Sequence, residues 1–184
     1  MIPFFFLSWI ALAAPISAND TATFRAKIVE HNLTASDIVF FIDYSKPIDQ
    51  RRFYAYDVKA RRTLYMDYVG HARASGVSIP TSFSNVLGTN MSSLGVYRVG
   101  EQYESATFGR SVRLHGLSTT NSRARERAIV IHDVKGGIVV TNSRFEQLYS
   151  KGCFTFFNAG YGRLLQFLRP GRTLVVYQGA TPAL

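Results

Sequence analysis

Residues Asp37–Tyr44 read DIVFFIDY, a β-branched and aromatic stretch that ends at the turn-forming Ser45-Lys46-Pro47. Such residues are enriched in strands, so this segment is predicted to be a strand. Two alternating segments follow it closely, Arg52–Val58 (RFYAYDV) and Thr63–Gly70 (TLYMDYVG). Alternation with a period of two is typical of a strand with one buried face. The three segments predict a β-meander that begins an antiparallel sheet.

The rest of the chain continues the β pattern with few helices. Further strands are predicted at Leu94–Val99, Ser111–Leu114, Ala128–His132 (AIVIH) and Thr173–Tyr177 (TLVVY). Short helices are predicted at Ala22–Glu30, Thr141–Leu148 and Ala159–Leu168, and an extended loop at Gly76–Ser93. The sequence has no internal repeat or low-complexity tract. Its 184 residues predict one mainly β domain, a sandwich or an incomplete barrel around one core.

The first eighteen residues differ from the rest. Ile2–Ala14 is apolar apart from Ser8, and Ile16-Ser17-Ala18 supplies a small residue where a signal peptidase would cut. The apolar run is too short to span a bilayer comfortably. Residues 1–18 are therefore predicted to be a cleaved secretory signal, and residues 19–184 the mature single domain. No Lys or Arg precedes the run, which leaves an uncleaved membrane anchor and a buried segment as alternatives. Export across the inner membrane, to a periplasm, is the expectation.

The formal charge is +9, from 21 Lys and Arg against 12 Asp and Glu. A basic protein is attracted to any polyanion. Nucleic acid is one candidate, because Arg123, Arg125 and Arg127 are clustered. No known nucleic-acid motif surrounds these arginines, so nucleic acid is not the expected partner. An acidic polymer of the cell envelope is a better fit for an exported chain.

Cys153 is the only cysteine, so it cannot form an internal disulfide. In an oxidising compartment a leftover thiol is a liability unless it has a role. His132 ends a predicted strand earlier in the chain. A thiol reacts as the thiolate, and a neighbouring imidazole can take its proton. We therefore predict that Cys153 is a nucleophile with His132 as its base; a buried structural thiol and an ordinary strand-end histidine are the alternatives.

Gly152, directly before the cysteine, bears on the same chemistry. A loop glycine lets the N–H groups around the nucleophile point at one spot. Each N–H that stabilises an oxyanion there raises the reaction rate by roughly 10²–10³-fold. The histidines show no close ligand spacing and the cysteine has no partner, so neither a metal nor a cofactor is expected. The GxSxG and SxxK patterns of serine enzymes do not occur.

These residues resemble the signature of the L,D-transpeptidase (YkuD-like) superfamily, in which a histidine precedes Ser/Thr-His-Gly-Cys. The matching residues are Ile131-His132 and Ser150-Lys151-Gly152-Cys153. The chain is more similar to the branch called the murein L,D-transpeptidase catalytic domain family. That similarity runs from about Val39 to Tyr177 through Phe41–Ser45 with Arg52, Thr81–Asn85, Ser92–Tyr97, Arg113–Leu117 and Ala124–His132.

The resemblance implies a β-sandwich-like catalytic domain with a few short helices and thioester chemistry on peptidoglycan stem peptides. Cys153 would attack the carbonyl of the L-configured end of a diaminopimelate residue, and His132 would protonate the departing D-amino acid. An amine of a second stem would then form a 3–3 crosslink, whereas water would make the enzyme an L,D-carboxypeptidase. An amidase that releases a wall-linked protein and a catalytically silent wall-binding domain are the further alternatives. The oligomeric state is left open.

Three positions depart from the family pattern. Lys151 replaces the histidine beside the glycine. Asp133 stands where glycine is common, and its main-chain carbonyl is expected to orient the ring of His132. Phe154-Thr155-Phe156 follows the cysteine without the arginine of the superfamily or the proline of the branch, which affects the acyl-acceptor side.

The remaining candidates are side chains for binding substrate. Lys151 and Ser150 are candidates because they flank the nucleophile, although Lys151 can equally be solvated. His71 lies in a segment that resembles a recurring family segment and is a candidate for lining the pocket. His115 is expected to be structural and His31 solvated.

Overall fold

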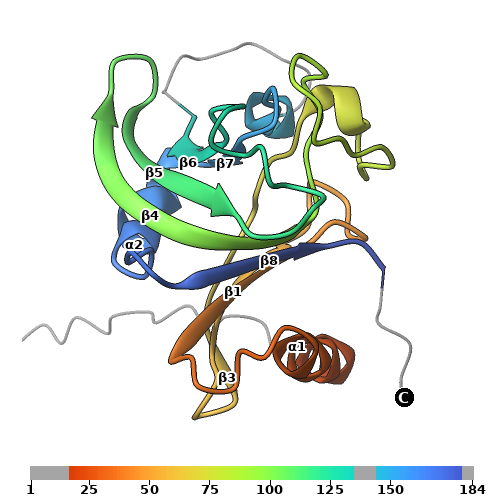
Figure 1. The fold of residues 1–184 in the computed structure, drawn as a ribbon, viewed down its shortest axis with the longest axis vertical. Helices are drawn as coiled ribbons and strands as arrows, with labels where there is room; N and C mark the ends of the chain where they lie inside the picture. The colour runs from red at the N-terminus through yellow and green to blue at the C-terminus, as the bar shows by residue number, and fades with distance from the viewer. Residues whose placement is uncertain (1–16, 135–143, 180–184) are drawn as a thin grey trace, which may run out of the picture.

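The computed structural model describes residues 17–134 and 144–179 (Figure 1). Over these ranges eight strands form one mixed sheet in the order β3-β2-β1-β8-β4-β5-β6-β7. The strands are β1 (Ile38–Asp43), β2 (Phe53–Asp57), β3 (Arg62–Asp67), β4 (Gly95–Ser105), β5 (Gly109–Gly116), β6 (Val130–Asp133), β7 (Phe154–Phe156) and β8 (Thr173–Tyr177). The helices are α1 (Ala18–Glu30) and α2 (Asn158–Leu165), with short 3-10 helices η1 (Arg73–Ser75) and η2 (Arg144–Leu148).

The predicted meander is confirmed, because β1 pairs antiparallel with β2 and β2 with β3. The other neighbour of β1 is the last strand. β8 runs parallel to β1, with Phe41 opposite Val175, and antiparallel to β4. A second parallel pair, β6 with β7, ends the sheet. The sheet as a whole is therefore mixed, and β8 joins the meander to the other strands.

Strand β1 is buried on both faces, which explains its unbroken apolar run. Phe40 and Ile42 face the main core, whereas Val39 and Phe41 belong to a second cluster beneath α1. The ring of Phe24 on α1 stacks on Phe41 with centroids 4.4 Å apart. Figure 1 shows α1 on the side of β1 and β3 opposite to the β4–β7 strands.

The amphipathic helix predicted at Ala22–Glu30 is confirmed, and Phe24 and Ile28 are both buried on its inner face. The helix begins earlier, at Ala18, because the Ser17 hydroxyl accepts a hydrogen bond from the Asp20 amide at 3.1 Å. An N-cap of this kind satisfies an amide that the helix itself leaves free. The predicted signal segment lies almost entirely outside the described residues. None of the helices within 17–134 and 144–179 is long and apolar enough to cross a membrane.

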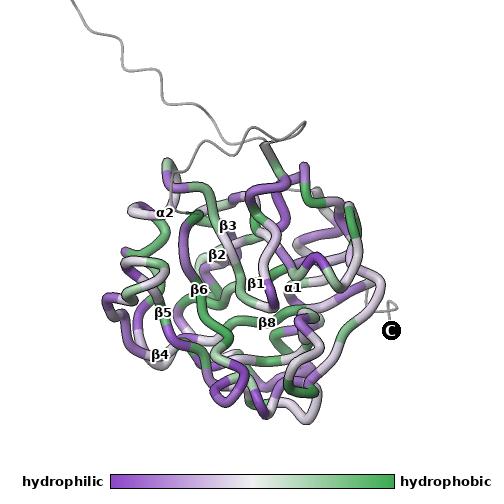
Figure 2. Tube along the Cα trace, turned by 90° about the horizontal axis from the view of Figure 1, so that it is seen from above, coloured by the Kyte–Doolittle hydropathy of each residue, from purple (hydrophilic) through white to green (hydrophobic). Residues whose placement is uncertain are grey.

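The sheet curls so that its two ends meet across the core. Phe53 on β2 and Phe156 on β7 are far apart in the strand order, yet their ring centroids lie 5.1 Å apart in an edge-to-face contact. The Gly70 amide, just after β3, donates to the Thr155 carbonyl at 2.8 Å. The two layers of the predicted sandwich are therefore two parts of one sheet, and the mainly β fold is confirmed. Figure 2 shows the hydrophobic stretches of β6 and β8 in the middle of the molecule.

Several boundaries differ from the prediction. The β4–β5 hairpin extends to Ser105 and Gly109, because backbone pairing continues beyond the buried part of both strands. The strand β7 was not predicted, since FTF is too short to show a period. The helix predicted at Thr141–Leu148 is the 3-10 helix η2, and its predicted caps, Thr141 or Asn142, lie outside the described residues. The long Gly76–Ser93 loop is confirmed.

Candidate functional site

The pairing of β6 with β7 decides where the predicted nucleophile and base lie. His132 is opposite Thr155 in this parallel pair. Residues opposite each other share a face of the sheet, and alternate residues along a strand return to that face. Cys153 precedes Thr155 by two positions and therefore faces the same side as His132. Ile131 and Phe154 point the other way, into the main core.

A cavity of about 750 Å³ opens on this face, and His132, Cys153 and Thr155 all line it. Its size is within the range of small-molecule sites. The structure brings five of the predicted site residues to its wall: Cys153, His132, Asp133, Ser150 and Lys151. Other parts of the wall come from the tip of the β4–β5 hairpin with Thr107 and Phe108, from η1 with Arg73, and from η2 and the residue after it. The further lining residues are Val134, Gln147 and Tyr149.

His132 is held on two sides. Its Nδ1 lies 2.7 Å from the Asp133 carbonyl oxygen, and the ring of Phe108 stacks on the imidazole with centroids 4.0 Å apart. Since a carbonyl only accepts, the proton of the ring is on Nδ1, which leaves Nε2 free to take a proton. Burial lowers the pKa of His132, so the ring favours its neutral form. The Asp133 backbone thus makes the contact that was expected of it.

The Cys153 thiol is hydrogen-bonded to the chain that precedes β6. Its Sγ donates to the Ala128 carbonyl oxygen at 3.6 Å. Ala128 has a φ of 54°, a left-handed conformation that is uncommon for a residue other than glycine. Burial raises the pKa of the Cys153 thiol, and the Val130 backbone and the charge of Arg127 oppose this rise. Both shifts favour a protonated thiol and a neutral imidazole, and the hydrogen bond of the thiol goes to Ala128 rather than to His132.

Gly152 allows the tight turn before the nucleophile. Its φ is +128°, a backbone conformation that strains any residue with a side chain, and a Cβ there would also lie 2.6 Å from Ile129 Cδ1, which would have to move. The Gly152 amide donates to Ser150 Oγ at 3.1 Å, and that hydroxyl donates to the Cys153 carbonyl at 2.7 Å. Ser150 therefore closes the turn as well as lining the cavity. The Gly152 amide itself is already engaged, so an oxyanion would need other donors. Lys151 is exposed.

Sequence reasoning missed the role of Arg127, which it grouped with Arg123 and Arg125 as a cluster that made nucleic acid a candidate partner. Arg123 pairs with Glu126 at 2.7 Å, whereas Arg127 turns inward. Its guanidinium donates to the Ser84 carbonyl at 2.7 Å and to the Met91 carbonyl at 2.5 Å. Arg127 therefore ties the long loop to the turn beneath Cys153. The three arginines are spaced two residues apart, and this spacing does not indicate which side chain points inward.

The prediction that His71 lines the pocket is wrong. The side chain is fully buried behind Tyr149, with ring centroids 5.2 Å apart. Its Nδ1 accepts from the Arg52 guanidinium at 2.6 Å, and its Nε2 donates to the Gly76 carbonyl at 3.0 Å. Burial and the charge of Arg52 lower the pKa of His71 to about 4. His71 is a neutral link inside the fold.

Phe108 was also missed, because a single aromatic residue in a polar turn carries no signal of its partner.

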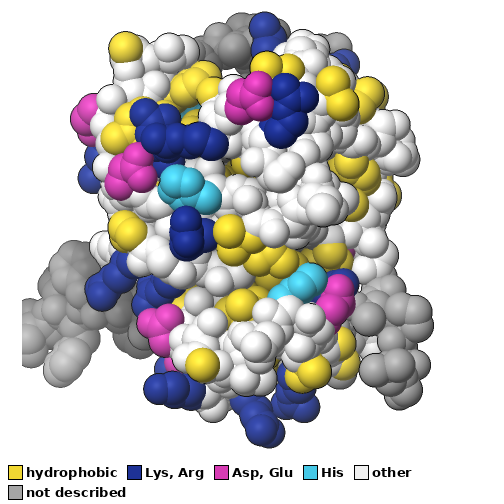
Figure 3. Space-filling view, viewed as in Figure 1, with side chains coloured by type: hydrophobic (Ala, Val, Ile, Leu, Met, Phe, Trp, Pro, Cys, Tyr) yellow, Lys and Arg dark blue, Asp and Glu magenta, His cyan; other side chains and the backbone are white. Residues whose placement is uncertain are grey.

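Within the described ranges, no group of three or more His, Cys, Asp or Glu side chains could hold a metal ion. Figure 3 shows Lys and Arg side chains scattered over one face of the molecule rather than merged into a single patch.

Comparisons with known proteins agree on the fold. The helical cell shape determining protein Pgp2 from Campylobacter jejuni is 12% identical with a TM-score of 0.53, covering 90% of this chain and 58% of that one. Bd1075 from Bdellovibrio bacteriovorus is 11% identical with a TM-score of 0.53, covering 79% of this chain and 49% of that one. This chain thus spans about half to three-fifths of the length of these proteins.

A comparison with curated protein sequences found no match. A family model described as the L,D-transpeptidase catalytic domain matches residues 14–177, which is most of the chain. The match includes every strand of the sheet and both sides of the cavity that holds Cys153 and His132. The chain therefore belongs to the L,D-transpeptidase catalytic domain family.

Proposed function

We propose that this chain is an exported cysteine acyltransferase that forms 3–3 crosslinks between peptidoglycan stem peptides through a thioester on Cys153. The observation that carries the proposal is the β6–β7 register, which places Cys153 and His132 on one face and in one cavity. Family membership supplies the substrate class. The net charge of +9 suits a substrate that bears several carboxylates.

The first half of the reaction forms the thioester. His132 Nε2 takes the proton of the Cys153 thiol as the sulfur attacks the carbonyl carbon of the stem residue. The peptide C–N bond then breaks, and the imidazolium gives its proton to the nitrogen of the departing D-amino acid. The hydrogen bond from Nδ1 to the Asp133 carbonyl keeps the ring in the tautomer that this step needs.

The second half releases the enzyme. The amine of a second stem attacks the thioester carbon, its proton passes to His132, and the C–S bond breaks. The thiolate then recovers a proton from the imidazolium. Water in place of the amine gives a tripeptide, which is the L,D-carboxypeptidase reaction, and an amidase would use the same pair on a protein–peptidoglycan link.

The electrostatics of the pair favour general-base catalysis. Burial raises the pKa of Cys153 and lowers that of His132, so both groups are neutral before substrate arrives. A positioned general base contributes roughly 10²–10⁴ in rate. The proton therefore moves from Cys153 to His132 during the reaction, and not before substrate binds.

The second candidate function is a catalytically silent wall-binding domain. The raised pKa of Cys153 and its hydrogen bond to Ala128 favour it, since both keep the sulfur protonated. Lys151 and Phe154, which depart from the family pattern beside the nucleophile, point the same way.

Incubation of the purified protein with tetrapeptide-containing muropeptides decides between these functions. We expect 3–3 dimers, with tripeptides as the hydrolytic side product, and neither product with Cys153→Ala. An acyl adduct on Cys153, measured by intact mass after exposure to a carbapenem-like agent, is expected for the enzyme only. Absence of products and of the adduct would establish the silent domain.

Export is tested separately, by fractionation of cells that express the full chain. We expect the protein outside the inner membrane with an amino terminus near Asn19, as read from its intact mass. A protein that keeps residues 1–18 and stays with the membrane would indicate an uncleaved anchor instead.

A further inference from the structure

His71 is a buried ionisable side chain that the proposed reaction does not use. Its Nδ1 lies 2.6 Å from the Arg52 guanidinium, and its Nε2 lies 3.0 Å from the Gly76 carbonyl oxygen. A guanidinium only donates and a carbonyl only accepts, so the ring fits between them only as a neutral imidazole with its proton on Nε2. Arg52 is fully buried, and within the described ranges no carboxylate oxygen lies within 4.0 Å of it. The imidazole is therefore a partner that this buried cation needs.

The segment that the ring closes, residues 71–76, is hydrogen-bonded to the tight turn of residues 150–153, here called the nucleophile turn. The Ser150 amide donates to the His71 carbonyl at 3.0 Å. The Ser150 hydroxyl donates in turn to the Cys153 carbonyl at 2.7 Å. Two hydrogen bonds through one serine thus connect the backbone of His71 to the nucleophile.

The ring of His71 also supports the wall of the catalytic cavity. Tyr149 lines this cavity, and its ring meets the imidazole edge to face with centroids 5.2 Å apart. The Tyr149 hydroxyl donates to the Val77 carbonyl at 2.7 Å, one residue beyond the end of the closed segment. The Arg73 guanidinium lies 4.8 Å from the centroid of the same tyrosine ring. A displacement of His71 would therefore move the wall as well as the nucleophile turn.

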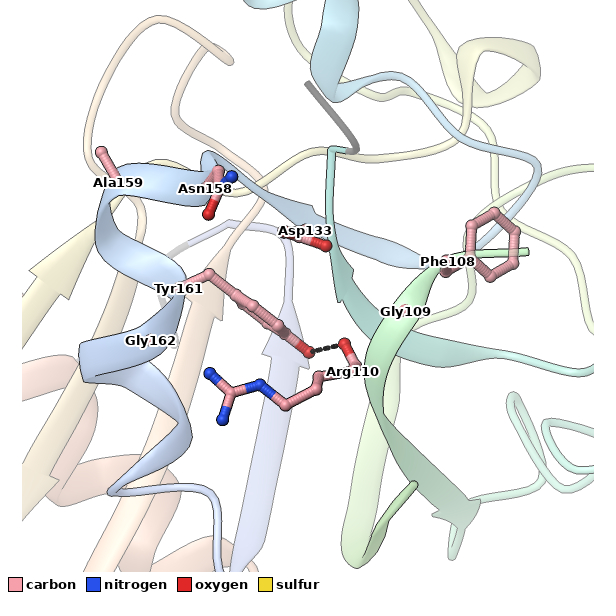
Figure 4. A pocket seen from close by; sticks show the side chains of 8 residues that line it. All are labelled: Phe108, Gly109, Arg110, Asp133, Asn158, Ala159, Tyr161 and Gly162. Carbon is pink, nitrogen blue, oxygen red and sulfur yellow. Dashed lines mark hydrogen bonds between the residues drawn. The ribbon is translucent and has the colours of Figure 1, made fainter. Parts of the chain in front are cut away.

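The base is held by a different support. The Tyr161 hydroxyl lies 2.9 Å from the Arg110 carbonyl oxygen on β5 and 3.2 Å from the Ile131 carbonyl oxygen on β6, next to His132. Figure 4 shows the Tyr161 side chain reaching from α2 to β5. These contacts do not involve residues 71–76. A displacement of that segment would therefore move the nucleophile relative to its base.

We propose that His71 is a positioning residue for Cys153, and that its neutral imidazole holds the nucleophile turn at the distance from His132 that acyl transfer needs. The inference rests on the proposed function and adds a control of the same site by pH. It gives a role to a buried histidine that touches neither substrate nor the reacting sulfur.

Protonation of His71 removes the acceptor that this arrangement uses. A proton on Nδ1 breaks the contact with Arg52 and leaves two cations facing each other. The other ionisable groups against the ring are the phenols of Tyr44 and Tyr149, with ring centroids 5.9 and 5.2 Å away. Neither phenol carries a charge that could compensate in acid. Acid should therefore release the nucleophile turn, apart from any effect on His132.

Two substitutions at His71 separate positioning from packing. His71→Gln can accept from Arg52 and donate to the Gly76 carbonyl, and it should keep the rate at which a carbapenem-like agent acylates Cys153. His71→Leu fills a similar volume without either hydrogen bond. We expect its acylation rate per folded molecule at pH 7, followed by intact mass, to fall about 10- to 100-fold, because small misplacements of reacting groups cost this much. His31→Leu should leave the rate unchanged.

The pH profile of acylation isolates the titration of His71. His132 is the same in the unaltered protein and in His71→Gln, so the ratio of their rates cancels its contribution. The pKa of His71 is about 4, and half of the imidazole is protonated at that pH. The ratio should therefore favour His71→Gln by about twofold at pH 4 and by nothing at pH 7.

An NMR titration of the full chain tests the coupling without acylation. We expect the amide resonances of Gly152 and Cys153 to shift with a midpoint near pH 4 in the unaltered protein. His71→Gln should lack this shift, whereas His132→Gln should keep it. This measurement decides the question even where His71→Leu does not fold.

Three results would overturn the inference: an unchanged acylation rate in His71→Leu, an equal loss in His71→Gln and His71→Leu, or identical titration of the nucleophile turn in His71→Gln and the unaltered protein. The proposed function fails separately. If the amides titrate with His71 but Cys153 never acquires an acyl group, the positioning role stands and the transferase does not. If acyl adducts form and the amides ignore His71, the transferase stands and the positioning role does not.

Discussion

The sheet has two regions in which burial has opposite consequences. Under α1, burial is apolar and aromatic: Phe24 contacts Phe41, Tyr54 and Tyr56 with ring centroids 4.4 to 5.5 Å apart. At the end of β6 and β7, burial covers ionisable groups, and it moves the pKa of Cys153 up and that of His132 down. The first region lowers the free energy of the fold. The second holds a thiol and an imidazole uncharged beside a cavity.

Cys153→Ala is the most direct test of this difference between the two regions. We expect crosslinking and hydrolysis of muropeptides to fall by on the order of 10³-fold or more, as for other catalytic nucleophiles. Stability measured by urea denaturation should barely change, because one sulfur is lost beside an open cavity. Large destabilisation with retained turnover would assign Cys153 to the core instead.

Phe24→Ala should show the reverse pattern. Removing a fully buried aromatic side chain leaves a space that neighbours fill only in part, and we expect a loss of about 3–5 kcal/mol. Acyl-adduct formation per folded molecule should be unchanged, since α1 lies on the far side of the sheet. Val29→Ala on the same helix, 72% exposed, is the matched control and should cost little.

Acid should destabilise the protein through His71. The folded pKa is about 4 against an unfolded value of 6.5, so between these limits only the unfolded state binds the proton. Stability should therefore fall as pH drops from about 6.5 to about 4, by about 3 kcal/mol from this group, and no further below. His71→Gln, which can accept from Arg52 and donate to the Gly76 carbonyl, should remove that part of the pH dependence.

Urea denaturation at pH 7 and pH 4 measures the effect, with His115→Gln as the control. The carboxylates contribute equally to all three proteins, so the difference isolates His71. The same acid loss in His71→Gln as in the unaltered protein would contradict the prediction.

The smallest of the predicted effects is a shift in the pKa of Cys153 when Arg127 is replaced. Its charge opposes the rise in the pKa of Cys153, so Arg127→Gln should raise that pKa further. The rate of thiol alkylation measured against pH should shift to more alkaline values, and Arg127→Lys should shift less. Arg123→Gln and Arg125→Gln remove the same charge from the same turn without touching the site. Equal shifts in all three would show that net charge, not position, is responsible.

The strands could be predicted from the sequence wherever burial gives a pattern. DIVFFIDY and TLVVY are continuous because both of their faces are covered, and RFYAYDV alternates in the predicted meander. The parallel pairing of β1 with β8 could not be predicted, because register over such a separation is set by packing rather than by local residue preference. The polar end of β4 could not be predicted either, because backbone hydrogen bonds rather than side-chain burial hold that part of the hairpin.

The site divides in a similar way. Cys153 and His132 were predicted from residue chemistry and from a resemblance, and the structure places both on one cavity. Arg127 and Phe108 were missed because their roles depend on direction, which side-chain type does not reveal. His71 failed as a pocket residue because a histidine in a family-like segment can equally be a neutral hydrogen-bonding link within the core.

The position of β8 has a consequence for how the chain folds. Among the described strands it comes last in the sequence, yet it stands between β1 and β4 in the middle of the sheet. Before residue 177 is available, the first three strands and the next four have no shared ladder, and neither group can close the core. Long-range pairing of this kind slows folding. A chain that lacks β8 therefore lacks its central ladder, and truncation just before Thr173 should leave two separate, aggregation-prone groups of strands.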